Sequence, residues 1–226
     1  IKGQYYPQSY VTQIKDEVAL PFVTVFDKDN LNRSVEFDSK GQADLDFQKG
    51  VLAFMGRASL ARIVSEASDP NETLVYTTPI ELPPSGTSQI LLNQVDPAVL
   101  NAYIAVHKVV DFVKRYIEIS QLPFVREGIN VRVNRNLYCN AFYESEGSVL
   151  VFYREGFSQG MRCANTALIS EVVYHEWGHA LDDYMGISSR TRNPTITGIV
   201  DDAFSEGIGD ILGVLITGDP NFGKGF

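Results

Sequence analysis

The chain lacks the features that mark several common classes of protein. No apolar run in its 226 residues reaches the roughly 18 that a membrane-spanning helix needs. It has no block of lysine and arginine, and its net charge of −9 argues against a nucleic-acid partner. The first ten residues, IKGQYYPQSY, lack the charged start and apolar segment of a signal peptide. We therefore expect either a protein made without one or the mature or excised part of a longer chain.

Cysteine is also scarce, with only Cys139 and Cys163 present. Two buried free thiols and one disulfide are both compatible with this count. We favour the disulfide, which would contribute about 3 kcal/mol in the chain-entropy model, because both cysteines flank segments that resemble the walls of an active site. The chain has no C-x-x-C pattern, so we do not predict that these cysteines bind a metal.

Short apolar or alternating segments predict a β-rich module over residues 1–66. The segments at 18–27, 34–38 and 43–47 are rich in β-branched residues or alternate between apolar and polar residues. Polar clusters that favour turns separate them. Residues 51–64 are compatible with a strand or a helix. The regular spacing indicates a small β-sandwich-like module.

Residues 67–226 combine helical and strand patterns, which predicts a second, α/β part and an α+β fold for the whole chain. Capping residues and proline mark where its first helix begins, and glycine marks the end of a later one. The predicted elements are a helix from Asp96-Pro97, strands at 129–134 and 148–153, a helix from about Ala167 to Tyr184 ended by Gly186, and a helix from about Asp202.

Two of the chain's three histidines lie in the stretch VVYHEWGHALDDY, residues 172–184. Positions i and i+4 of an α-helix share one face, so His175 and His179 can offer ring nitrogens to one Zn²⁺. Glu176 is rotated away from both, near the open side of the metal, where it can deprotonate a zinc-bound water. The alternative is a partly exposed helix with two histidines. The third histidine, His107, lies in the first predicted helix, where a structural role is expected.

A catalytic zinc usually has a third protein ligand, and no histidine follows His179. The stretch DDAFSEGIGDILG offers a carboxylate instead, Glu206. Asp210 lies four residues later on the same face and can accept the other ring N–H of the first histidine. Gly207 and Gly209 each cost a helix about 1 kcal/mol, which suggests that they let two helices approach closely. The alternative is an amphipathic helix with solvated carboxylates.

At these segments the chain resembles the gluzincin metallopeptidases, and most closely the thermolysin-like and fungalysin-like families. YHEWGHALDDY and AFSEGIGDIL carry the specific part of the resemblance. CNAFYESEGSVLVFY is similar to the family's edge strand, and LNAYIAVHKVVDFVKRY to its long helix. The similarity covers residues 90–215. It implies an α/β lobe with a central zinc helix, followed by a helical C-terminal lobe.

The resemblance also implies a role for individual residues. His175, His179 and Glu206 would bind zinc, Glu176 would be the general base, and Asp210 would orient His175. The Asn-Ala pair of the edge strand, Asn140 and Ala141 here, would bind the substrate backbone. The family often binds calcium, for which Asp182, Asp183, Asp201 and Asp202 are candidates, although a solvated acidic surface explains these carboxylates equally well.

One departure from the family concerns the residues that stabilise the oxyanion, which lie in its helical C-terminal lobe. This chain has no histidine after Glu206, and that lobe is missing from it. We therefore expect a C-terminal continuation or a second polypeptide to complete the cleft.

The resemblance predicts a secreted (extracellular or periplasmic) zinc endopeptidase that acts on proteins or peptides. An aminopeptidase of the same group is an alternative, although its G-x-M-E-N segment is absent. A zinc-containing binding or scaffold protein without turnover is the other alternative.

Overall fold

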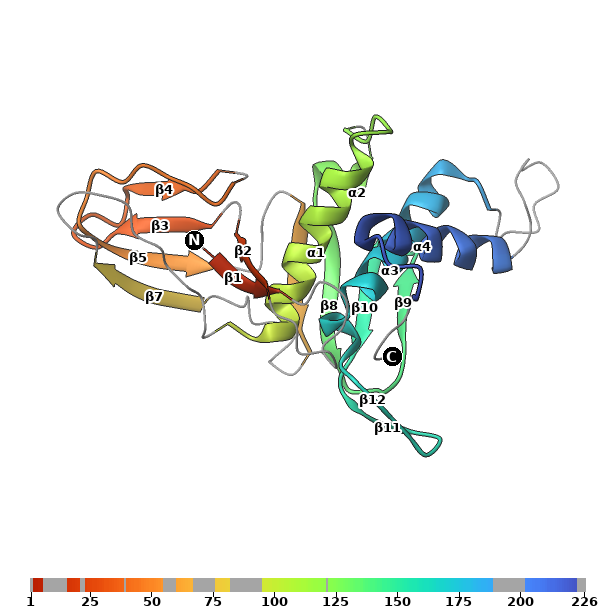
Figure 1. The fold of residues 1–226 in the computed structure, drawn as a ribbon. Helices are drawn as coiled ribbons and strands as arrows, with labels where there is room; N and C mark the ends of the chain where they lie inside the picture. Colours follow the sequence, from red (N-terminus) through yellow and green to blue (C-terminus); the bar gives the residue numbers. More distant parts are fainter. Residues whose placement is uncertain are drawn as a thin grey trace.

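The computed structural model confirms a mixed α+β fold with several sheets (Figure 1). It describes residues 2–5, 16–20, 23–38, 40–54, 60–66, 76–81, 95–120, 122–188 and 202–222. The strands are β1 (Lys2–Tyr5), β2 (Asp16–Ala19), β3 (Thr24–Asp27), β4 (Ser34–Glu36), β5 (Lys49–Phe54), β6 (Ala61–Ser65), β7 (Tyr76–Glu81), β8 (Ile129–Arg135), β9 (Ala141–Glu144), β10 (Val149–Tyr153), β11 (Gly156–Ser158) and β12 (Met161–Cys163). The helices are α1 (Pro97–Val113), α2 (Pro123–Arg126), the 3₁₀ turn η2 (Thr166–Leu168), α3 (Ser170–Met185) and α4 (Asp202–Thr217).

The first of two four-stranded sheets, here the N-terminal sheet, is antiparallel with strand order β4-β3-β5-β7. Within the ambiguous stretch 51–64, the described residues at 51–54 end β5 and those at 61–64 form most of β6, so these residues form strands and not a helix. The strand predicted at 43–47 is absent. Its alternating residues Ala43, Leu45 and Phe47 are instead partly buried against the core without a partner strand. Alternation there reflects which side chains face inward, and not a hydrogen-bonded ladder.

The second sheet, here the central sheet, has strand order β6-β8-β10-β9. β8 pairs in parallel with both β6 and β10, and β9 forms the antiparallel edge. Residues at every second position of β8 are buried, namely Ile129, Val131 and Val133. Helix α1 packs against β6 and β8, and α3 packs against β9 and β10, so both helices cover the sheet (Figure 1).

The two sheets exchange strands across residue 66, which is the boundary predicted from the sequence. β6 lies before it and pairs with β8 of the central sheet. β7 lies after it and pairs with β5 of the N-terminal sheet. The chain therefore passes from the first sheet to the second and back again before it enters α1.

Local signals in the sequence set the ends of the helices as predicted. Asp96 caps α1, because its Oδ1 accepts from the backbone N–H of Ala98 at 2.8 Å, and Pro97 follows as the first helical residue. Gly186 ends α3 with a left-handed φ of 61°. The start of α3 differs slightly, since η2 and an extended Ile169 precede it. Among the described residues, no helix has both the length and the apolar character needed to cross a bilayer.

Candidate metal centre

Helices α3 and α4 lie side by side and bring together three side chains, here called the metal group: His175, His179 and Glu206 (Figure 1). Nε2 of His175 lies 3.0 Å from Nε2 of His179 and 3.1 Å from Oε2 of Glu206. Nε2 of His179 lies 3.5 Å from Oε1 of Glu206. Ligands about 2.0–2.1 Å from a tetrahedral zinc are separated by about 3.3 Å. The three separations in the metal group therefore match one face of such a tetrahedron.

The hydrogen-bond partner of His175 indicates why these atoms favour a cation. Nδ1 of His175 lies 2.9 Å from Oδ1 of Asp210, and a carboxylate oxygen accepts, so Nδ1 carries a proton. In the neutral ring, Nε2 then faces a carboxylate oxygen and a second ring nitrogen with its lone pair. A proton on Nε2 could be donated to only one of these two neighbours, whereas a cation could be coordinated by all three ligand atoms. The residues present thus fit a bound metal ion.

Glycine lets α3 and α4 come close enough for this convergence. A Cβ on Gly178 would lie 3.0 Å from Cα of Gly209, and a Cβ on Gly209 would lie 2.7 Å from Nδ1 of His175. The predicted close approach is therefore confirmed at Gly209. It is wrong for Gly207, where an added Cβ would meet no atom within 4 Å. Gly207 lies on a side of α4 that does not contact α3.

The metal group is buried on one side and open on the other. The side chains of His179 and His175 are 5% and 12% exposed, whereas those of Glu206 and Asp210 are 60% and 50% exposed. Glu176 follows His175 on α3 and is only 5% exposed. A cation held here would have a side that solvent or a ligand can reach.

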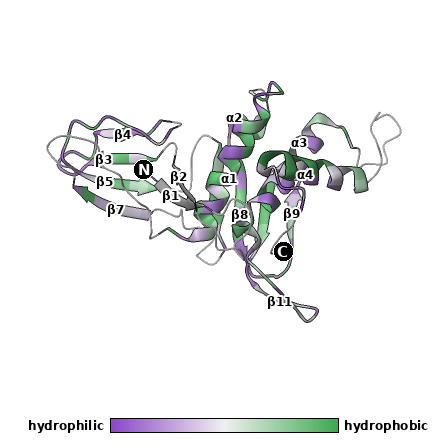
Figure 2. Cartoon of the chain, viewed as in Figure 1, coloured by the Kyte–Doolittle hydropathy of each residue, from purple (hydrophilic) through white to green (hydrophobic). Residues whose placement is uncertain are grey.

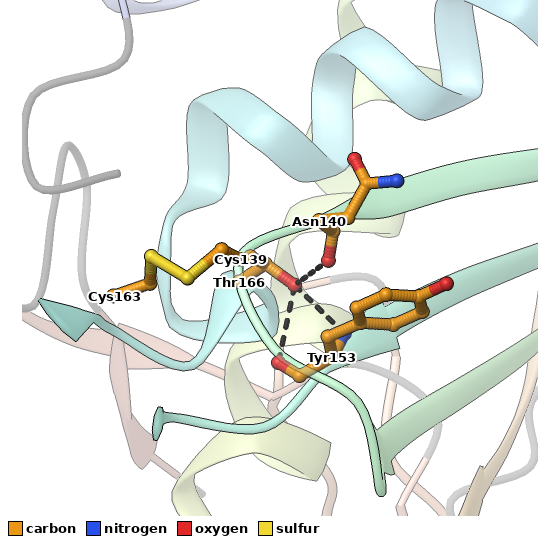
Figure 3. Close-up of a disulfide and its surroundings, with 5 residues drawn as sticks. All are labelled: Cys139, Asn140, Tyr153, Cys163 and Thr166. Atoms are coloured by element: carbon orange, nitrogen blue, oxygen red, sulfur yellow. Dashed lines mark hydrogen bonds between the residues drawn. A yellow bond between two sulfur atoms is a disulfide. The ribbon is translucent and has the colours of Figure 1, made fainter. Parts of the chain in front are cut away.

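The segment before the edge strand β9 is fixed by a disulfide and by one hydroxyl (Figure 3). The predicted Cys139–Cys163 bond is present and joins this segment to the end of β12. The Thr166 hydroxyl donates to the carbonyl of Asn140 at 3.0 Å and accepts from the backbone N–H of Tyr153 at 2.9 Å. The side chain of Asn140 is exposed, and Ala141 is buried as the first residue of β9. The Asn140-Ala141 pair thus lies at a constrained point of the sheet edge.

Two of the four calcium candidates take hydrogen bonds from neighbouring side chains. Asp182 is buried and accepts from the hydroxyls of Ser188 and Ser205. Asp183 accepts from the hydroxyl of Tyr143 at 3.0 Å. Asp201 lies outside the described residues, as does the side chain of Asp202. Within the described part of the chain, the metal group is the one set of three or more His, Cys, Asp or Glu side chains whose ligand atoms all lie within 4.8 Å of one another.

Sequence reasoning missed one neighbour of the metal group, Ser205. Its Oγ lies 3.1 Å from Nδ1 of His179, on the side of the ring that faces away from the other ligand atoms. The sequence places Ser205 directly before Glu206, but the contact with His179 forms only where α4 packs against α3.

Comparison with known proteins adds no assignment, because no protein-family model and no curated protein matches this chain.

Proposed function

We propose that the chain carries the zinc site of a metallopeptidase that hydrolyses internal peptide bonds. The observation that supports this most is the convergence of His175, His179 and Glu206, with Glu176 directly after the first histidine in the sequence. Two imidazoles and one carboxylate leave the fourth position of a tetrahedral zinc open. Catalytic zinc sites have this arrangement, whereas structural sites are closed by four protein ligands.

Each residue near the metal group has a proposed role. Zinc bound here would lower the pKa of a coordinated water to about 7 and polarise a substrate carbonyl. Glu176 accepts the proton of the attacking water and passes it to the leaving amine. Asp210 accepts the Nδ1–H of His175 and so holds the ring with Nε2 toward the metal position.

The substrate is proposed to bind along β9, the edge strand of the central sheet. An extended peptide can add to such an edge through backbone hydrogen bonds. Asn140 and Ala141 would bind its backbone. The disulfide and the Thr166 hydroxyl restrict this segment, which lowers the entropy lost on binding.

The open side of α4 suggests what completes the cleft. Phe204, Ile211 and Leu215 are spaced by seven and four residues on this helix and are 40%, 60% and 60% exposed. The green parts of α4 in Figure 2 are its apolar residues. We infer that a C-terminal continuation or a second polypeptide covers this face and supplies the oxyanion-stabilising group. Full peptidase activity in a preparation whose only mass is 25.1 kDa would contradict this inference.

An extracellular or periplasmic location is part of the proposal, because disulfides persist in those compartments.

The test combines metal content with activity. Elemental analysis of the wild-type chain should find one zinc, which Glu206→Ala loses or binds far more weakly. Casein hydrolysis by the completed enzyme should require Glu176, so Glu176→Gln should keep its zinc and lose activity. Zinc binding without hydrolysis of casein or of aminoacyl amides would favour the scaffold alternative. Hydrolysis of aminoacyl amides alone would favour the aminopeptidase.

A further inference from the structure

A buried carboxylate lies behind the second histidine of the metal group. Nδ1 of His179 lies 3.1 Å from Oγ of Ser205 in the first turn of α4. The same Oγ lies 2.8 Å from Oδ2 of Asp182, which is on α3 and only 2% exposed. Ring, hydroxyl and carboxylate therefore form a continuous chain of hydrogen bonds that leads from the metal position into the interior.

The carboxylate fixes the direction of these hydrogen bonds. A carboxylate oxygen accepts, so the single hydroxyl hydrogen of Ser205 points to Asp182. The hydroxyl oxygen must then accept from His179, and the proton of the neutral ring must lie on Nδ1. Nε2 of His179 keeps its lone pair and faces the other ligand atoms of the metal group, the nearest at 3.0 Å.

Asp182 is itself held in place by the turn that follows α3. Its Oδ1 accepts from the backbone N–H of Ser188 at 2.8 Å, and its Oδ2 also accepts from the hydroxyl of Ser188. Both oxygens of the buried carboxylate are therefore engaged as acceptors. Rotating the carboxylate away from Ser205 would leave several buried donors unpaired.

We propose that Asp182 is a positioning residue of the metal centre. Acting through the Ser205 hydroxyl, it holds His179 in the tautomer that presents Nε2 to the metal. The inference rests on the metal site of the proposed function and extends it. His175 has its carboxylate partner in direct contact, whereas His179 reaches its carboxylate through a hydroxyl on the other helix.

An amide cannot replace this carboxylate in either orientation. In an Asp182→Asn variant, an amide NH₂ turned toward Ser188 would face the backbone N–H, which is also a donor. Turned toward Ser205, the NH₂ would donate to the hydroxyl, which would then give its own hydrogen to Nδ1 of His179. The proton of the neutral ring would move to Nε2, the atom that must bind the metal.

The first test measures zinc affinity by competition with a chromophoric chelator. Asp182→Asn and Ser205→Ala should each weaken zinc binding by about 10–100-fold, the usual effect of removing a partner of a metal ligand. Ser205→Thr keeps the hydroxyl and should restore most of the affinity. Asp183→Asn is the matched control. It changes the same residue type by the same charge at the next position of α3, but Asp183 accepts from the hydroxyl of Tyr143 on β9 instead of from Ser205.

The second test reads the tautomer directly in the metal-free protein. Long-range ¹H–¹⁵N correlation spectra in mildly alkaline buffer, where imidazole is neutral, should place the proton of His179 on Nδ1. The chain has only three histidines, which makes their assignment practicable. Asp182→Asn should move this proton to Nε2, and Asp183→Asn should leave it in place. Circular dichroism confirms that each variant is folded.

The two tests separate the inference from the function on which it rests. A wild-type chain that binds no zinc overturns the proposed function and this inference together. If the wild-type chain binds zinc and the Asp182→Asn and Ser205→Ala variants bind it equally tightly, the inference alone is overturned. A metal-free wild-type chain whose His179 carries its proton on Nε2 also overturns the inference alone.

Discussion

His107 is the histidine that does not take part in the metal group, and it shows how burial can outweigh other influences on an imidazole. It lies in α1, is 7% exposed, and donates from Nδ1 to the carbonyl of Tyr103 at 2.8 Å. Burial lowers the pKa of His107 below its usual value, although the Tyr103 carbonyl and the nearby Asp111 both act to raise it. The folded protein therefore favours the neutral form of His107.

This shift predicts that His107 makes the protein less stable in mild acid. Above the unfolded-state pKa of about 6.5, neither state binds the proton and the full stability is present. As the pH falls below that value, the unfolded state binds a proton that the folded state excludes. The free energy of unfolding then decreases, with a slope of at most about 1.4 kcal/mol per pH unit for one group. Urea unfolding in chelator across this range should show the slope in the wild type and a reduced slope in His107→Gln. Parallel curves for the two proteins would contradict the assignment.

At the scale of elements, the approach of α4 to α3 depends on Gly209 and not on Gly207. Gly209→Ala should push the ring of His175 from its place, because the added Cβ would lie 2.7 Å from Nδ1. We expect a loss of about 1–3 kcal/mol in stability, as for other overpacked sites, together with weaker zinc binding. Gly207→Ala is the matched control on the same helix. It should gain up to about 1 kcal/mol from helix propensity and keep its zinc affinity. Equal effects of the two substitutions on zinc affinity would contradict the proposed packing.

Elements whose signals are local could be predicted from the sequence, and those that depend on distant partners could not. The spacing of His175 and His179, the Asp96-Pro97 start of α1 and the Gly186 end of α3 each depend on a few adjacent residues. The pairing of β6 with β8 joins distant segments, and no local pattern specifies it. The same holds for Ser205, whose contact with His179 exists only once the two helices have packed.

At the scale of the whole molecule, the exchange of β6 and β7 predicts that the two sheets unfold together. Each sheet contains a strand whose neighbours in the chain belong to the other sheet. The ring of Phe54, in the N-terminal sheet, packs edge-on against that of Tyr103 in α1, with centroids 5.0 Å apart. Buried residues of both parts form one hydrophobic cluster. Losing the structure around α3 would therefore expose surface in the N-terminal sheet as well.

Zinc provides a way to test this coupling, because the proposed site lies on the same helix as a single spectroscopic reporter. Trp177 is the only tryptophan and is fully buried in α3, so its fluorescence follows that helix, whereas far-UV circular dichroism follows all elements. Zinc at about 1,000 times its Kd should add about 4 kcal/mol to the free energy of unfolding, since the ligand set exists only in the folded state. If the sheets are coupled, both signals should shift by the same amount, because their transitions coincide in two-state unfolding. Glu206→Ala should show coincident transitions that zinc does not move. The opposite outcome would be a second dichroism transition that zinc does not shift, alongside a fluorescence transition that it does. The N-terminal sheet would then unfold on its own, and the strand exchange would not couple the two parts.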